Sequence, residues 1–258
     1  DLPLLGETSG KNAIIVTPSA DLDLAVADVV KSAFGNAGQK CSAASLVILV
    51  GSVGESERFR RQLADAVTSM KVGWPQDPAT LMGPIVESVQ GKLKRGLTQL
   101  ADGESWLVEP RRLDDTGRLW SPGVRDGVLP GSEFHLTEYF GPVLGIMTAR
   151  TLDEAIALQN AVDYGLTAGI HSLDTDEVAH WMDTVQAGNL YVNRVITGAI
   201  VRRQPFGGWK RSGVGPNAKV GGPNTLFVLG DWTPVEAGPA GDLTLGELDP
   251  RVAAFIET

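Results

Sequence analysis

Short runs of β-branched and apolar residues alternate with helix-length stretches along most of this chain, and this alternation constrains its fold more than any other feature. The strand-like runs are residues 12–16, 45–50, 105–109, 143–148, 167–172 and 188–193. The helix-like stretches are one capped by Ser19 or Asp21 and ended by Gly35, then 55–70, 88–102, 152–160 and 175–185. Such alternation is typical of α/β domains, so we expect helices around a mainly parallel sheet.

Three stretches do not follow this alternation. Residues 110–131 and 198–223 are rich in Gly and Pro, and we expect loops there. Residues 224–232 predict a late strand, followed by an acidic surface tail. We therefore divide the chain into a leading segment, 1–11, a main domain, 12–223, and a strand with its tail, 224–258.

Charge and composition exclude several classes of function. The formal net charge of −9 leaves no electrostatic footprint for nucleic acid or an anionic membrane. We find no run of eighteen apolar residues and no secretory signal in residues 1–10, so we expect a cytoplasmic protein without a membrane span. One cysteine and three scattered histidines do not make a structural zinc site, so no metal is expected.

The single cysteine, Cys41, follows Gly38-Gln39-Lys40 and precedes a buried strand. In such a turn a cysteine can act as a thiolate nucleophile, and the neighbouring Lys40 would favour its ionisation. A lone cysteine is more often a small buried apolar residue. Spacing alone favours this second interpretation.

Two carboxylates and a glycine-rich turn are further candidates, each with an ordinary structural alternative. Glu7 could be a general base that activates water, whereas an acidic residue near a terminus is usually solvated. Glu138 could accept hydrogen bonds from ribose hydroxyls or serve as a turn carboxylate. The turn at 204–208 (QPFGG) could approach a ligand closely or be a common loop. None of these residues decides the function alone.

Together the motifs form one ordered series that covers the chain up to about residue 232. The series is Glu7-Thr-Ser-Gly-Lys11, Gly38-Gln-Lys-Cys41, Glu138-Tyr-Phe-Gly-Pro142, Tyr164-Gly-Leu166, Gly188-Asn189 with Val192-Asn193, and Pro205-Phe-Gly-Gly208 with Ser212-Gly213. It resembles the aldehyde dehydrogenase superfamily. The resemblance implies the catalytic domain of that fold, with Cys41 as nucleophile and Glu7 as general base. It also implies that Glu138 and Phe140 contact the nicotinamide ribose of NAD.

Two motifs, 39–43 (QKCSA) and 197–208 (TGAIVRRQPFGG), resemble one branch of this superfamily, the Δ1-pyrroline-5-carboxylate dehydrogenases. They look especially like the dehydrogenase part of bacterial bifunctional proline utilisation proteins. The substrate-binding residues that this resemblance implies are Lys40, Ser42, Gly198, Ala199 and Phe206. In that branch the amides at 198–199 and the hydroxyl at 42 bind the substrate's α-carboxylate, and the phenyl ring packs on its methylenes. Ala199 lacks the hydroxyl that some relatives place there, which weakens this anchor.

The implied activity is NAD-dependent oxidation of L-glutamate γ-semialdehyde to L-glutamate in proline catabolism, through a thioester on Cys41. In the family the dinucleotide-binding domain lies mostly before the position of Glu7, and no glycine-rich dinucleotide motif precedes Glu7 here. We therefore expect a C-terminal catalytic fragment that lacks most of its NAD-binding domain and is inactive alone. In the full-length enzyme, which a proline dehydrogenase domain could precede, the strand at 224–232 is expected to pair subunits of a homo-oligomer.

Two alternatives stay open. The first is another semialdehyde dehydrogenase branch, such as one acting on succinate semialdehyde; the motif at 40–42 and the loop at 198–199 favour a substrate with an α-amino acid head instead. The second is a catalytically silent α/β assembly module. Cys41 and Glu7 argue against the silent module, since a scaffold needs neither residue.

Overall fold

The structure is a computed structural model, and it describes residues 4–215, 219–222, 225–231 and 233. The chain divides into two units, 1–225 and 226–258, and everything described below on the sheet and the site belongs to the first.

Within the described residues, seven strands form one sheet in the order β4-β5-β6-β3-β2-β8-β9. Their bounds are β2 Asn12–Val16, β3 Ala44–Val50, β4 Ser105–Val108, β5 Gly123–Asp126, β6 Val143–Ala149, β8 Thr167–His171 and β9 Asn189–Val192. Every neighbouring pair is parallel except β4 and β5. The prediction of a mainly parallel sheet is thus confirmed.

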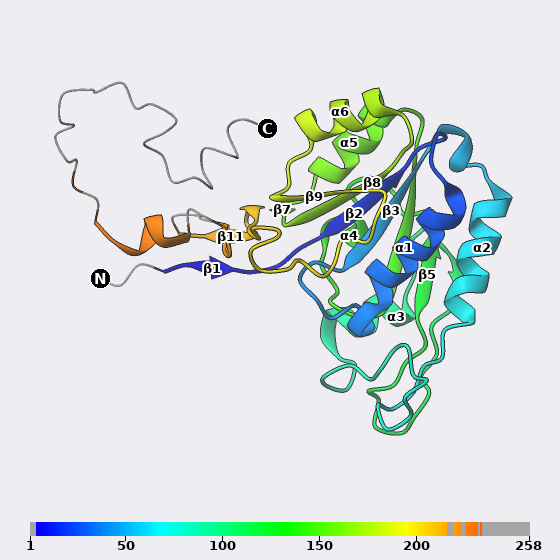
Figure 1. The fold of residues 1–258 in the computed structure, drawn as a ribbon. Coiled ribbons are helices and arrows are strands. Elements are labelled where there is room, and N and C mark those ends of the chain that lie inside the picture. The colour runs from blue at the N-terminus through cyan, green and yellow to red at the C-terminus, as the bar shows by residue number, and fades with distance from the viewer. Residues whose placement is uncertain (1–3, 216–218, 223–224, 232, 234–258) are drawn as a thin grey trace. The chain divides into compact units, whose positions relative to one another are not determined.

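Helices cover both faces of this sheet (Figure 1). On one face lie α1 Leu22–Phe34 and α2 Glu57–Thr68, and on the other α5 Leu152–Asn160 and α6 Thr175–Thr184. Alternate residues of a strand point to opposite faces. Ile14 and Val47 therefore belong to the core under α1 and α2, whereas Ile15 and Ile48 belong to the core under α5 and α6. Both faces of the central strands are buried, which explains why these strands are continuous apolar runs.

Shorter elements complete the unit. The helical ones are η1 Gly35–Gly38, η2 Gly51–Val53, α3 Gly91–Thr98 and α4 Glu133–Leu136. Two pairs of short antiparallel strands lie outside the main sheet: β1 Gly6–Glu7 with β11 Gly213–Val214, and β7 Tyr164–Gly165 with β10 Trp209–Lys210. The Asp21 side chain accepts hydrogen bonds from the first amides of α1, so Asp21 is the helix cap.

Three sequence expectations need correction. The stretch 110–131 contains strand β5, which glycine and proline neighbours hide and which adds to the sheet beside β6. Helix α3 covers only part of the expected 88–102. In the expected strand at 224–232, Thr225–Leu229 form the 3-10 helix η3, in which local hydrogen bonds take the place of a strand ladder. Asn224 and Trp232 lie outside the described residues.

Five segments of the motif series are collected at one edge of the sheet because each lies just before, or at the start of, a parallel strand. The segment with Glu138 precedes β6, Cys41 precedes β3, Glu7 precedes β2, and the motifs at 164–166 and 188–189 lead into β8 and β9. These five strands are neighbours in the order β6-β3-β2-β8-β9. Parallel strands start at the same edge, so the fold brings the motifs together at the amino edge.

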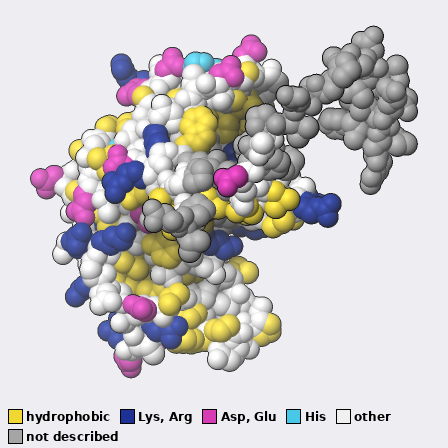
Figure 2. Space-filling model, turned by 90° about the vertical axis from the view of Figure 1, so that its left-hand side faces the viewer, with side chains coloured by type: hydrophobic (Ala, Val, Ile, Leu, Met, Phe, Trp, Pro, Cys, Tyr) yellow, Lys and Arg dark blue, Asp and Glu magenta, His cyan; other side chains and the backbone are white. Residues whose placement is uncertain are grey.

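On the face drawn in Figure 2, acidic and basic side chains are interspersed over the surface. None of the described helices is long and apolar enough to cross a membrane.

Candidate active site

Cys41 lies half-buried in a turn between η1 and β3. The Ala43 amide donates to the Lys40 carbonyl at 3.0 Å and closes this turn. The backbone before it passes through left-handed conformations, ending at Gly38 with φ 67°. A Cβ on Gly38 would lie 2.2 Å from the Gly141 carbonyl oxygen, so only glycine allows this close approach.

Two buried side chains hold the carbonyl groups of this turn. Asn12 Nδ2 donates to the Cys41 oxygen at 2.7 Å and to the Ala43 oxygen at 2.9 Å. Thr167 Oγ1 donates to the Ser42 oxygen at 3.2 Å, and the Thr167 amide donates to Asn12 Oδ1 at 3.1 Å. Three successive carbonyls are therefore fixed by residues at the starts of β2 and β8.

Glu7 is placed by the pairing of β1 with β11, in which Glu7 lies opposite Gly213. Ser212, which is fully buried, anchors this pair: its hydroxyl donates to the Ser9 carbonyl at 2.7 Å and accepts the Gly165 amide at 3.0 Å. Two motifs that are some 200 residues apart in the sequence thus meet, and the leading segment is held against the main domain.

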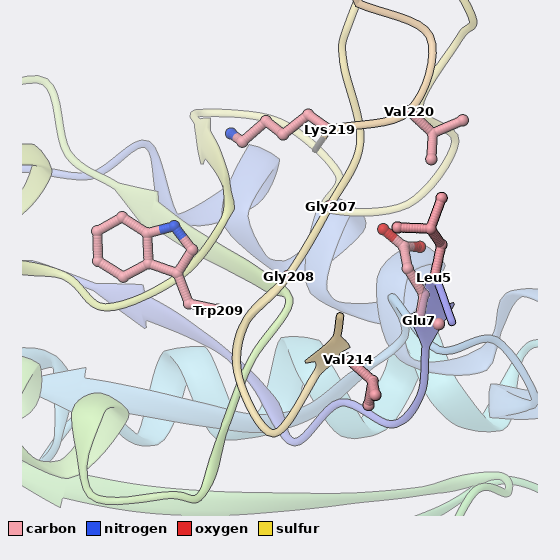
Figure 3. A pocket seen from close by; sticks show the side chains of 9 residues that line it. Leu5, Glu7, Gly207, Gly208, Trp209, Val214, Lys219 and Val220 are labelled. Carbon is pink, nitrogen blue, oxygen red and sulfur yellow. The ribbon is translucent and has the colours of Figure 1, made fainter. Parts of the chain in front are cut away.

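A cavity of about 300 Å³ opens beside Glu7. Its lining comes from the start of the chain around β1 and from the segment 207–220. The lining residues are Leu5, Gly6, Glu7, Gly207, Gly208, Trp209, Val214, Lys219 and Val220. Figure 3 shows the Glu7 carboxylate beside Leu5, with Trp209 pointing away from it on the other side of the glycine pair. Gly207 borders the carboxylate: a Cβ there would lie 3.5 Å from Glu7 Oε1, an ordinary van der Waals contact.

The carboxylates of Glu7 and Glu138 both influence the pKa of the Cys41 thiol. Burial raises the pKa of the Cys41 thiol, the charges of Glu7 and Glu138 raise it further, and the amides of Ser42 and Cys41 oppose this rise. Partial burial also raises the pKa of Glu7. The expectation that Lys40 favours the thiolate is therefore not met, because burial and the two carboxylates outweigh the stabilising groups. Because the thiol pKa is raised, a base must remove its proton before the sulfur can attack, and Glu7 is a carboxylate within electrostatic range of that sulfur.

Glu138 and Phe140 lie on the β6 side of Cys41. The Gly10 amide donates to Glu138 Oε1 at 3.1 Å and links this carboxylate to the segment that carries Glu7. Phe140 adopts a left-handed φ of 55° and leaves 40% of its surface exposed. Gln39 Nε2 donates to the Phe140 carbonyl at 3.2 Å, so the segment that leads to Cys41 also holds the backbone of Phe140.

The residues expected to bind substrate are only partly brought together. Ser42 is buried next to Cys41, and Lys40 lines a small pocket with Glu138 and Phe140. Phe206 pairs with Val220, next to the glycines that border the Glu7 cavity. Gly198 has φ 84° and begins, with Ala199, an exposed loop for which the described residues show no hydrogen bond to the Cys41 turn.

Sequence reasoning missed four residues of this site. Gly10, Asn12 and Thr167 organise the Cys41 turn, and Lys11 lies buried with its Nζ 4.3 Å from the centre of the Phe134 ring. Burial lowers the pKa of Lys11 to about 7, against the opposing charge of Glu138. Lys11 and Gly10 belong to the quoted motif 7–11, but a polar residue at a strand start gives no signal of what it will contact across the sheet.

Gly10 provides the first test of the packing around Cys41. A Cβ on Gly10 would lie 2.4 Å from the Cys41 carbonyl oxygen and 2.7 Å from Asn12 Oδ1. We expect Gly10→Ala to lower the free energy of unfolding by about 1–3 kcal/mol, measured by urea denaturation. Gly83→Ala is the control, because a Cβ there meets nothing within 4 Å. Equal stability of the two variants would show that the Cys41 turn is not packed against Gly10.

Within the described residues, no group of three or more His, Cys, Asp or Glu side chains could hold a metal ion. The side chains present offer instead a thiol, two nearby carboxylates and an exposed aromatic ring. This set suits attack on a polarised carbonyl followed by proton transfer.

Comparisons with known proteins identify a matching family and similar solved structures. The sequence model of the aldehyde dehydrogenase family matches residues 2–227. The 1-pyrroline-5-carboxylate dehydrogenase of Geobacillus sp. (strain WCH70) is 36% identical over 227 residues, which cover 87% of this chain and 43% of that protein. The solved structure of Proline Utilization A (PutA) from Corynebacterium freiburgense is 60% identical with a TM-score of 0.88, and the match covers 94% of this chain and 25% of that one.

A further solved structure, a 1-pyrroline-5-carboxylate dehydrogenase from Thermus with bound NAD, is 36% identical with a TM-score of 0.75 and is matched over 87% of this chain and 43% of its own. The chain thus spans less than half the length of the relatives that it matches.

Proposed function

This chain belongs to the aldehyde dehydrogenase family, and from that premise we propose that it is the catalytic part of an NAD-dependent L-glutamate γ-semialdehyde dehydrogenase. The main support for this proposal is the position of the single thiol, Cys41. It lies in a turn that the Asn12 side chain holds by a hydrogen bond, and the charge of Glu7 acts on it. Complete activity is proposed for a longer protein that also supplies the dinucleotide-binding half.

In the proposed reaction, Glu7 takes up the Cys41 proton and the thiolate sulfur attacks the aldehyde carbon, forming a carbon–sulfur bond and a charged oxygen. Loss of hydride from that carbon then gives a thioester. Glu7 then releases that first proton to solvent and accepts another from water while the water oxygen attacks the thioester; the sulfur leaves as the thiolate and is reprotonated, which gives the carboxylic acid and the free thiol. The cavity beside Glu7 has room for this water.

The cofactor side of the site suits a nicotinamide riboside. Glu138 uses Oε1 for the Gly10 amide, and its second oxygen is available to accept ribose hydroxyls. Phe140 presents a partly exposed ring next to it. When bound, NAD supplies the hydride acceptor for the oxidation. The role of these two side chains is to hold and orient the ribose next to Cys41.

The substrate assignment rests on the similarity to proline-catabolism enzymes and on the residues around the turn. We propose that the amides of Gly198 and Ala199 bind the α-carboxylate, assisted by Ser42 and Lys40, with Phe206 on the methylenes. Backbone amides bind a carboxylate without burying an additional charge. The relative named PutA also leads us to propose that the parent protein is a cytoplasmic homo-oligomer that carries a proline dehydrogenase domain.

Rates on two semialdehydes test the substrate assignment. For the chain extended upstream by a dinucleotide-binding domain, we expect kcat/KM for glutamate γ-semialdehyde to exceed that for succinate semialdehyde by about 10- to 100-fold, because only the former has an α-carboxylate with an amino group beside it. NADH formation at 340 nm measures both. Equal values, or a preference for the succinate compound, would assign the enzyme to another semialdehyde branch.

A further inference from the structure

The Asn12 side chain contacts one end of the Cys41–Ser42 peptide group, and the amide at the other end is one of the groups that favour the Cys41 thiolate. Asn12 Nδ2 donates to the carbonyl oxygen of Cys41, and the amide of that same peptide belongs to Ser42. A peptide unit is planar, so fixing its oxygen also fixes the direction of its N–H. The Ser42 amide is one of the two groups that act on the thiol in the direction of ionisation.

We propose that Asn12 is a positioning residue that holds the Cys41–Ser42 peptide with its N–H directed at the reacting sulfur. The hydrogen bond to the carbonyl also polarises the peptide, which makes the N–H a better donor. Asn12 thereby stabilises the thiolate without touching substrate or cofactor. This inference rests on the proposed role of Cys41 as the nucleophile.

The orientation of the Asn12 amide is itself determined by its neighbours. Its oxygen accepts the Thr167 amide at 3.1 Å, so its nitrogen must face the carbonyls of Cys41 and Ala43. The side chain is 3% exposed and the β2–β3 register shifts between Asn12 and Ala13. Asn12 pairs with Ala44, so the irregularity separates this pair, next to the Cys41 turn, from the regular ladder that begins at Ala13.

Thiolate absorbance at 240 nm, titrated against pH on this chain, tests the inference directly, because Cys41 is the single cysteine and Cys41→Ser provides the blank. We expect Asn12→Ala to raise the thiol pKa by about one, which lowers the thiolate fraction at neutral pH about tenfold. Asn12→Ser retains a buried hydroxyl that cannot reach both carbonyls, so it should fold and give a smaller rise. Circular dichroism checks that each variant is folded.

Gln159→Ala is the matched control. Gln159 is also a buried side-chain amide, on α5: its Nε2 donates to the carbonyl of Ala13 in β2 at 2.8 Å, and its Oε1 accepts from the Trp181 indole. Its loss should cost stability and leave the Cys41 pKa unchanged. A folded Asn12→Ala or Asn12→Ser with the wild-type pKa, or an equal rise in Gln159→Ala, would overturn the positioning role.

Iodoacetamide alkylation separates this result from the proposed function. A wild-type thiolate that forms but reacts no faster than a free cysteine of the same pKa would contradict the nucleophile assignment, whatever the titration of the Asn12 variants shows. A reactive wild-type thiol with an unchanged pKa in both Asn12 variants would contradict only the positioning role. A reactive thiol that becomes harder to ionise in these variants supports both.

Discussion

Replacing Cys41 with serine in the enzyme extended by its dinucleotide-binding half should lower kcat for glutamate γ-semialdehyde by about 10⁴-fold or more. The hydroxyl is a far weaker nucleophile than the thiol, and Glu7 is too weak a base to ionise it. The change removes one soft atom from a half-buried position, so the free energy of unfolding should change by less than about 1 kcal/mol. NADH formation measures the activity, and thermal unfolding the stability.

Ser52→Ala is the control for this experiment, because Ser52 lies in η2 after β3, at the other end of that strand from Cys41. It should retain wild-type kcat. Residual activity of Cys41→Ser within tenfold of the wild type would rule out a thioester on this residue and would revive the silent-module interpretation of the chain.

Replacing Glu7 with glutamine should lower the steady-state rate by about 10²- to 10⁴-fold, since a general base contributes that much. The amide keeps the size of the side chain but cannot accept a proton from water. Where deacylation is the step most affected, the first turnover still forms NADH. We therefore expect a burst equal to the enzyme concentration, followed by very slow turnover, in a stopped-flow measurement at 340 nm.

The pH dependence of that burst follows from the two pKa directions. Cys41 has a raised pKa, so the acylation rate in Glu7→Gln should increase with pH. The charge of Glu7 contributes to that raised pKa, so its removal should move the increase to a lower pH than in the wild type. Glu55→Gln, an exposed change in the η2–α2 loop, should show neither a burst nor a shift. Unimpaired turnover of Glu7→Gln would transfer the role of general base to another group.

Much of the fold could be predicted because buried strands consist of apolar residues, which are recognisable in the sequence. The central strands are covered by helices on both faces, so 13–16 and 46–50 are continuous apolar runs, and Asp21 marks the start of α1. Strand β5 could not be predicted in this way. It contains the polar pair Arg125–Asp126, and the buried Arg125 is satisfied by an ion pair with Glu104, which directly precedes β4, and by hydrogen bonds to the Gly96 carbonyl.

The residues of the site likewise include some that could be predicted from the sequence and some that could not. The motifs that contain Cys41, Glu7 and Glu138 can be related to a family by their order along the sequence. The parallel sheet then brings these motifs to one edge. Asn12 and Thr167 carry no such signal, since their contacts depend on the register of β2 against its neighbours and on a shift within it. The direction of the Cys41 pKa also depends on packing: a neighbouring Lys40 predicts a decrease, and burial with two carboxylates gives an increase.

One measurement tests the central claim most directly. Glu7→Gln enzyme is incubated with glutamate γ-semialdehyde and NAD, quenched in acid and digested with trypsin, which cuts after Lys40 and after Arg58. We predict a γ-glutamyl thioester on the peptide 41–58, detected by mass spectrometry and removed by hydroxylamine. An unmodified peptide 41–58 from enzyme that has formed NADH would contradict the assignment of Cys41 as the nucleophile.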